Sequence, residues 1–235
     1  MIRVGATADK EHACCLYKTT ADGTHGVAIL LTGFGTEAMP GTVCDDAIQK
    51  TVNFAAHYLQ RTAQMFLAEP QPPTEYIKTL MRKQLVKLND SVHHISNHLG
   101  QGVYLSGVFC YLADKQFVSI HFGRTFAFLW DGENFSDLTP EEIRNDPYIR
   151  NALGGTLAWE GVVAEGVFPA KHQLLFTSEA ITEQALNGMK EELRHANQVV
   201  IPRTVYKNLR RGEYPLAVLN LTQTVDIQSG GEVHD

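Results

Sequence analysis

The stretch FVSIHFGRTFAFLWDGENFSDLTPEE, Phe117 to Glu142, decides the expected fold. Apolar side chains alternate along it with a period of two, which predicts strands with one shared buried face: Phe122, Phe126, Phe128 and Trp130. The pair Asp131-Gly132 predicts a hairpin turn. The string TPEE at 139–142 is typical of a helix start with proline in the first turn, so a helix ending near Gly154 should follow.

The segments around this stretch extend the same reading. Further strands are expected at 2–8, 12–19, 25–34, 102–113, 159–167, 172–178, 197–202 and 214–226. Long amphipathic helices are expected from Asp45 or Asp46 and from Thr74 as a cap to Gly100, and shorter ones at 180–196 and 204–212. Strands come in runs and do not alternate regularly with helices, which predicts an α+β fold with helices covering antiparallel sheets.

Composition limits the possible functions. The chain has 235 residues, 44% of them hydrophobic, and a formal net charge of −6, which argues against nucleic-acid binding. Neither a signal peptide nor an apolar run long enough for a membrane span is found, so a cytoplasmic protein is expected. Its four cysteines have no metal-site or disulfide spacing. We expect one domain at 1–228 and a flexible tail at 229–235.

Four strings, in this order, resemble those of the metal-dependent, type 2C serine/threonine protein phosphatases. They are ILLTGFGTEA at 29–38, the Phe117–Glu142 stretch, ALGG at 152–155 and LLFTSEAIT at 174–182. The resemblance implies a four-layer α-β-β-α sandwich of two antiparallel sheets flanked by helices. It also implies a site where acidic oxygens hold two Mn²⁺ or Mg²⁺ ions, which activate a water for attack on phosphorus.

The chain departs from that pattern at almost every position where the family carries a metal ligand. Thr32 replaces the aspartate of the family's Asp-Gly turn, and only Gly33 remains. Arg124 stands where the family has the aspartate of Gly-Asp-Ser-Arg, and Tyr214-Pro215 replaces a late Asp-Asn pair. Only Glu179 keeps a carboxylate. One carboxylate cannot offset the repulsion between two dications, which is several kcal/mol even at a dielectric constant of ~20.

Glu179 therefore has two interpretations. It is the vestige of a metal ligand at a strand-to-helix junction, or an acid in the first turn of a helix that Thr177 and Ser178 cap. Arg124 is a possible contact for an anion or a partner.

Three other side chains are candidate ligands by type and spacing. Asp22 imitates a metal-binding turn but fits a hairpin better. His94 and His98 share a helix face and could bind a transition metal, although that face is expected to be solvated.

The leading hypothesis is a catalytically degenerate phosphatase-like domain, a pseudophosphatase without a metal cofactor. It would act as a regulatory or scaffold module for a partner protein, such as a kinase or a phosphoprotein. The alternative is an active phosphatase that uses Mn²⁺ or Mg²⁺ in a rearranged site built from Glu179 and other acids: Asp22, Glu37, Asp45 or Asp46. A third hypothesis is an unrelated α+β binding protein.

Overall fold

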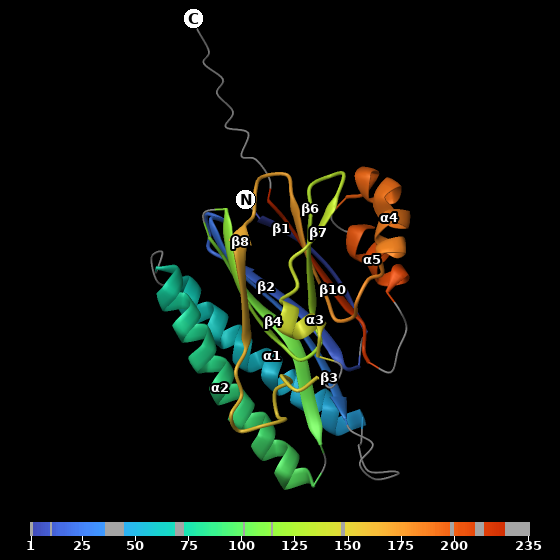
Figure 1. The fold of residues 1–235 in the computed structure, drawn as a ribbon. Helices are drawn as coiled ribbons and strands as arrows, with labels where there is room; N and C mark the ends of the chain where they lie inside the picture. The colour runs from blue at the N-terminus through green and yellow to red at the C-terminus, as the bar shows by residue number, and fades with distance from the viewer. Residues whose placement is uncertain are drawn as a thin grey trace, which may run out of the picture.

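Two antiparallel β-sheets face each other, and helices cover the outer face of each sheet (Figure 1). This is the four-layer α-β-β-α sandwich that the sequence predicted. The computed structural model describes residues 2–9, 11–35, 45–68, 73–100, 102–113, 115–146, 149–197, 200–209 and 214–223. The expected tail at 229–235 lies outside these residues, as does Glu37.

The first sheet has the strand order β2-β3-β4-β5-β8, and every neighbouring pair is antiparallel. Its strands are β2 (Ala13–Thr19), β3 (His25–Gly35), β4 (Val103–Ala113), β5 (Gln116–Phe122) and β8 (Val162–Val167). Strands β3 and β4 pair along all eleven residues of each, so they form the rigid centre of this sheet.

The second sheet has the order β1-β10-β9-β6-β7, again antiparallel throughout. Its strands are β1 (Ile2–Ala8), β6 (Phe126–Trp130), β7 (Phe135–Asp137), β9 (Gln173–Thr177) and β10 (Ala217–Gln223). The first strand of the described residues therefore pairs with the last.

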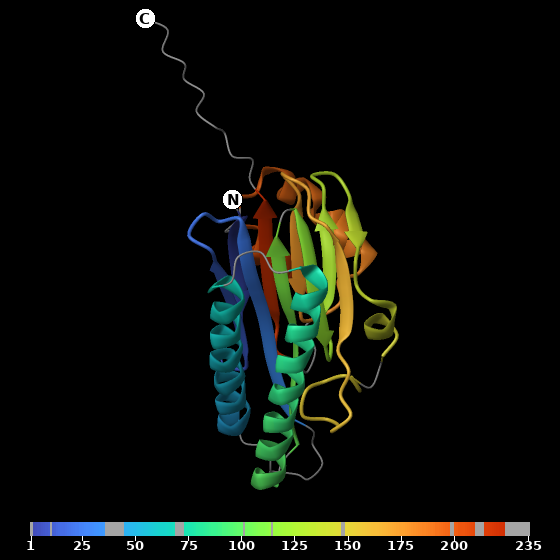
Figure 2. The same ribbon diagram turned by 90° about the vertical axis from the view of Figure 1, so that its left-hand side faces the viewer.

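Two long helices, α1 (Asp45–Ala68) and α2 (Thr74–Leu99), lie against the outer face of the first sheet (Figure 2). Helices α4 (Glu183–His195) and α5 (Val200–Asn208) cover the second sheet, and the one-turn helix α3 (Glu141–Arg144) lies beyond β7. Helix α2 ends in Gly100 at φ 63°, a left-handed cap that glycine adopts without steric cost.

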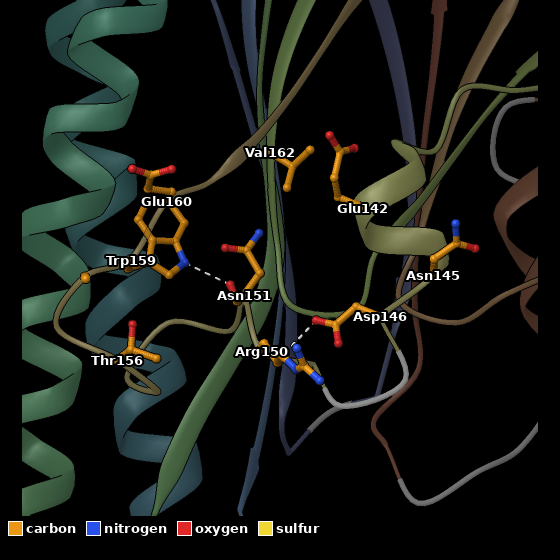
Figure 3. Close-up of a pocket in the computed structure, with 10 residues that line it drawn as sticks. Glu142, Asn145, Asp146, Arg150, Asn151, Thr156, Trp159, Glu160 and Val162 are labelled. Atoms are coloured by element: carbon orange, nitrogen blue, oxygen red, sulfur yellow. Dashed lines mark hydrogen bonds between the residues drawn. The ribbon is translucent and has the colours of Figure 1, made fainter.

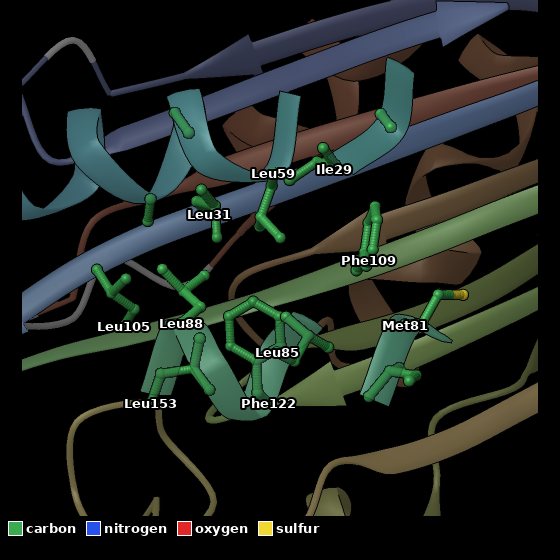
Figure 4. Packing of buried hydrophobic residues seen from close by; sticks show 14 of the residues in the cluster. Ile29, Leu31, Leu59, Met81, Leu85, Leu88, Leu105, Phe109, Phe122 and Leu153 are labelled. Atoms are coloured by element: carbon green, nitrogen blue, oxygen red, sulfur yellow. The ribbon is translucent and has the colours of Figure 1, made fainter. Parts of the chain in front are cut away.

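The apolar core has three layers that correspond to the spaces between the elements. Under α1 and α2, side chains of the helices interlock with those of β3, β4 and β5; Leu85, Leu88, Phe109 and Phe122 are fully buried there (Figure 4). A second layer fills the space between the sheets, and a third lies under α4 and α5. Each such side chain contributes about 2 kcal/mol of transfer free energy, so the apolar stripes fix which face of each element is buried.

The expected single face of alternating aromatic residues is wrong in one respect. Phe126, Phe128 and Trp130 do share a face of β6, but Phe122 lies on β5 in the other sheet. The chain crosses between the sheets at 123–125, where Gly123 has φ 63°. A Cβ on Gly123 would lie 2.2 Å from Ser106 Oγ, so this crossing requires glycine.

Two expected elements were wrong. The helix from TPEE is α3, which stops at Arg144 and does not reach Gly154; the sequence has a proline at 147, which disfavours a continuing helix. The strand expected at 197–202 is absent from the described residues there, since Val200 to Pro202 begin α5, with Ile201 packed in the core under this helix. The β-branched residues of this segment predicted a strand, but the packing of the segment as a helix outweighs that local preference.

Two expected helix starts also differ in detail. Pro73 is the N-cap residue of α2 and makes no side-chain cap bond, so the cap expected at Thr74 was wrong. In TPEE the Thr139 hydroxyl accepts from Ala127 N–H, which ties it to β6, and Pro140 is the N-cap residue of α3.

Candidate functional site

Four segments distant in sequence meet at one end of the sandwich. Thr32 near the end of β3 pairs with Ser106 of β4, and the Ser106 hydroxyl accepts the Arg124 N–H at 3.0 Å. The Arg124 side chain in turn reaches Glu179, which follows β9. Tyr214, just before β10, packs edge-on against Phe34 with ring centroids 5.3 Å apart. The positions that the resemblance singled out therefore lie at a common end of the two sheets.

The central interaction at this end is an ion pair between Arg124 and Glu179. Arg124 donates to Glu179 Oε1 from Nε at 2.8 Å and also from Nη2. The Glu179 side chain is 5% exposed and the Arg124 side chain 33% exposed, so the carboxylate is buried and the guanidinium covers it. The guanidinium also lies over the Phe126 ring, 5.8 Å from its centroid.

Glu179 is not a first-turn helix acid, so that interpretation was wrong. Helix α4 begins at Glu183, four positions further on, and its N-cap is Thr182, whose hydroxyl accepts from Ala185 N–H at 3.2 Å. The Glu179 carboxylate accepts from Ala180 N–H at 3.2 Å and from Arg124, and the helix dipole has no part in holding it.

Thr177 and Ser178 do not cap the helix either. The Thr177 hydroxyl donates to the Glu179 carbonyl at 2.8 Å, which fixes the backbone turn that carries the carboxylate. The Ser178 hydroxyl donates to the Pro215 carbonyl at 3.0 Å and accepts from Ala217 N–H at 2.8 Å. These bonds tie the end of β9 to the start of β10.

Thr32 and Gly33 are packing positions. Thr32 is 3% exposed. A Cβ on Gly33 would lie 2.5 Å from Val52 Cγ2 and 2.7 Å from Ile48 Cγ2, so glycine here allows α1 to lie close against β3. Gly33 thus has a structural explanation that involves no ligand.

Asp22 lies at the other end of the molecule from Glu179. It is in the turn before β3, about 23 Å of strand from Thr32 at 3.3 Å per residue. Its carboxylate accepts from Thr24 N–H at 3.1 Å and from the hydroxyl groups of Thr20 and Thr24, and these bonds lower its pKa to about 2. The structure does not bring Asp22 and Glu179 together.

The remaining candidate ligands do not form a metal-binding group either. Asp46 pairs with Lys50 at 2.5 Å on α1, and the Asp45 side chain is 85% exposed. His94 and His98 lie on the exposed side of α2. Within the described ranges, no three His, Cys, Asp or Glu side chains are placed to hold a metal ion.

The residues at the site do not fit a pair of divalent cations. Hard cations require several oxygen ligands, carboxylates above all, and the described residues contain no group of three or more His, Cys, Asp or Glu side chains placed to hold a metal ion. The Glu179 carboxylate is already bound by a guanidinium, whose positive charge repels a cation. We therefore derive no chemical step through a metal at this site.

His121 is a buried polar residue that the sequence reading missed. It is fully buried between the hydroxyl groups of Ser119 and Thr125, each 3.1 Å from a ring nitrogen. Burial lowers its pKa to about 4, so the ring is neutral at pH 7. Its position in an apolar strand gave no sequence signal apart from the serine two residues before it.

The fold is that of the type 2C serine/threonine phosphatases, which confirms the fold expected from the resemblance. A bacterial serine phosphatase, in a form bearing a point mutation, matches with a TM-score of 0.71 at 12% identity, over 95% of this chain and 99% of that one. PppA, described as a key regulatory component of the T6SS in Pseudomonas aeruginosa, matches with a TM-score of 0.66 at 15% identity, over 94% and 97% of the two chains.

A third similar structure is the catalytic domain of the serine/threonine phosphatase PstP in complex with two manganese ions. It matches with a TM-score of 0.64 at 15% identity, over 95% of this chain and 99% of that one. No family model and no curated protein matches the sequence. Among the helices described, none has both the length and the apolar character needed to cross a bilayer.

Proposed function

We propose that this chain is a pseudophosphatase: a phosphatase-like domain that has lost metal-dependent catalysis and acts as a regulatory or scaffold module for a partner protein. The observation that carries the proposal is the Arg124–Glu179 ion pair. It puts a fixed positive charge on the one carboxylate that remains among the expected ligand positions.

The energetics of the pair support this function. Separating the buried carboxylate from its partly exposed guanidinium partner costs about 2 kcal/mol, because the acid is left desolvated and unpaired. A metal ion would have to displace Arg124, and the described residues contain no group of three or more His, Cys, Asp or Glu side chains placed to hold it. The likeness to PppA, a regulatory component in its own system, is compatible with a regulatory role.

A turnover assay tests the loss of catalysis. The protein is freed of metal, supplied with Mn²⁺ or Mg²⁺, and given p-nitrophenyl phosphate and a phosphoserine peptide, with the catalytic domain of PstP as the positive control. We expect no turnover above buffer. Metal-dependent turnover that disappears in Glu179→Gln would overturn the proposal and favour the alternative, an active phosphatase with a rearranged site.

Thermal unfolding supplies a second, independent readout. A ligand that binds only the folded state raises the melting temperature, so Mn²⁺ and Mg²⁺ should leave the transition unchanged. The variant Arg124→Ala frees the carboxylate and should still show no saturable shift, since a single carboxylate is a weak site. A saturable rise in the wild type would contradict the proposal.

The partner class is part of the same proposal. A kinase or phosphoprotein partner fits a phosphatase-like surface that binds without turning over. Affinity capture from the native source, with Arg124→Glu as the comparison, tests whether the degenerate end contacts that partner.

A further inference from the structure

Strand β8 is an edge strand with a free side. It pairs with β5 alone, and within the described chain no strand covers its other edge. Its sequence, VVAEGV at 162–167, contains no proline, and its one charged side chain, Glu165, is bound by Lys78 of α2. Val167 is 61% exposed. An edge of this kind carries unpaired N–H and C=O groups that can bind another extended chain.

Two cavities flank the segment that leads into β8. One, of about 640 Å³, is lined by Glu142, Trp159, Glu160 and Val162, among others (Figure 3). The other, of about 320 Å³, lies between Trp159 and α2, where Val86 is part of its wall. Trp159 is held in place by its indole N–H, which donates to the Asn151 carbonyl at 2.8 Å. A groove therefore continues from the start of the free edge.

The charge of the larger cavity indicates which kind of side chain it can bind. Glu142 and Glu160 lie on either side of Val162 in Figure 3, and within the described chain neither carboxylate has a hydrogen-bond or ion-pair partner. A third acid, Asp146, accepts from Arg150 N–H at 2.6 Å, and Arg150 is the one cation among the described residues of the wall. Three carboxylates against one guanidinium favour a cationic side chain.

We propose that the free edge of β8 binds an extended segment of a partner protein, with an arginine or lysine of that segment between Glu142 and Glu160. Both sheets of this protein are antiparallel throughout, so we take the added strand as antiparallel to β8. Its C-terminal end then lies at Val162, and the basic residue belongs at that end. Hydrogen bonds between the two backbones provide the affinity, and the contact of the basic side chain with the acidic cavity fixes the register of the added strand along β8.

This inference builds on the binding role proposed above, but it uses different side chains from the Arg124–Glu179 pair. Each of the two proposals can be disproved without affecting the other. Metal-dependent turnover would overturn the pseudophosphatase and leave peptide binding untouched, whereas loss of peptide binding would leave the catalytic question open.

The probe is a fluorescein-labelled peptide, Thr-Val-Thr-Val-Thr-Arg, added to the whole protein and followed by fluorescence anisotropy. Three comparison peptides carry glutamate in place of the arginine, the arginine at the N-terminal end, or N-methyl groups on the second to fifth residues, which block both edges of the peptide strand. We expect the first peptide to bind most tightly. N-methylation should abolish binding, because it removes backbone donors without changing the charge.

The protein variant Glu142→Gln/Glu160→Gln should weaken binding of the arginine peptide roughly tenfold, the combined effect of losing two ion pairs with exposed carboxylates. Glu183→Gln/Glu192→Gln on α4 removes the same charge elsewhere and should bind as the wild type does. Hydrogen exchange at 162–167 should slow when the peptide is bound. The inference is overturned if the arginine peptide shows no measurable binding, or if the glutamate peptide or the N-methylated peptide binds equally well. It is also overturned if the Glu142→Gln/Glu160→Gln variant binds as the wild type does, or if hydrogen exchange at 162–167 is unchanged by the peptide.

Discussion

Arg124 and Glu179 are held together where strands of two different sheets end, with Arg124 Nε 2.8 Å from Glu179 Oε1. Arg124 lies on the crossing from β5 to β6, and Glu179 follows β9. The pair therefore links the turn that joins the two sheets to a strand end in the second sheet.

A double-mutant cycle measures this link. Arg124→Ala leaves a buried carboxylate without its cation and should lower the free energy of unfolding by about 2 kcal/mol, less than for a fully buried pair because the guanidinium is partly exposed. Glu179→Gln should cost about 1 kcal/mol. Urea denaturation should show that the double variant is less destabilised than the sum. Strict additivity would mean that the two side chains do not stabilise each other.

His121 should make stability fall in weak acid. Its pKa is about 4 in the folded protein and about 6.5 when unfolded, so between these values the unfolded chain binds the extra proton. Stability is then complete above pH 6.5 and is lost as the pH falls toward 4, by roughly 3 kcal/mol at most.

The measurement compares urea midpoints at pH 7 and pH 4.5 for the wild type, His121→Asn and the exposed-site control His94→Asn. The difference between the two pH values should shrink in His121→Asn and persist in the control. An unchanged pH dependence in His121→Asn would rule out this ring as its source.

Gly33→Ala tests whether that glycine serves packing. The new methyl group would lie 2.5 Å from Val52 Cγ2, so α1 must shift and the protein should lose about 2 kcal/mol of stability. Gly188→Ala is the matched control: it lies in α4 with open space around it and should gain up to about 1 kcal/mol. A neutral Gly33→Ala would show that the helix is not in close contact there.

Asn89 fastens the segment before β8 to helix α2. It is fully buried, donates from Nδ2 to the Thr156 carbonyl at 2.8 Å, and accepts from Gly154 N–H at 2.8 Å. Asn89→Ala leaves both backbone groups unpaired and should cost about 2 to 3 kcal/mol.

Limited proteolysis shows which part of the structure loosens in Asn89→Ala. Trypsin should cleave after Arg150 faster in Asn89→Ala than in the wild type, because the loop is no longer fastened. Asn187→Ala, an exposed site on α4, should cleave as the wild type does. Equal cleavage in all three proteins would contradict this role of Asn89.

The sequence predicted most of the fold because its signals were local and repeated. Period-two strands, the stripe of α2 and the Asp-Gly turns each depend on neighbouring residues only. The prediction for 197–202 failed because its valines and isoleucine favour a strand, whereas Val200 to Pro202 begin a helix whose Ile201 is buried against the second sheet. A local sequence pattern does not show that the rest of the fold favours a helix at this segment.

The site was harder to predict than the fold. The resemblance marked Arg124 as a departure from the family's pattern and Glu179 as the carboxylate that remains, and only the crossing between the sheets brings the two into contact across 55 positions. The groove beside β8 had no signal at all, since its acids come from α3 and from a segment without regular structure. Such sites depend on contacts between residues far apart in the sequence, which a local periodic pattern does not reveal.

The pairing of β1 with β10 has a consequence for biosynthesis. Seven residue pairs join these strands, from Ile2–Gln223 to Ala8–Ala217. On the ribosome, β1 is made first and must wait for nearly the whole of the described chain before its partner exists. The β2–β3–β4–β5 meander and the two long helices can assemble earlier, so the second sheet should be the last part to become protected, and a nascent chain stalled before β10 would expose β1 to chaperones or to aggregation.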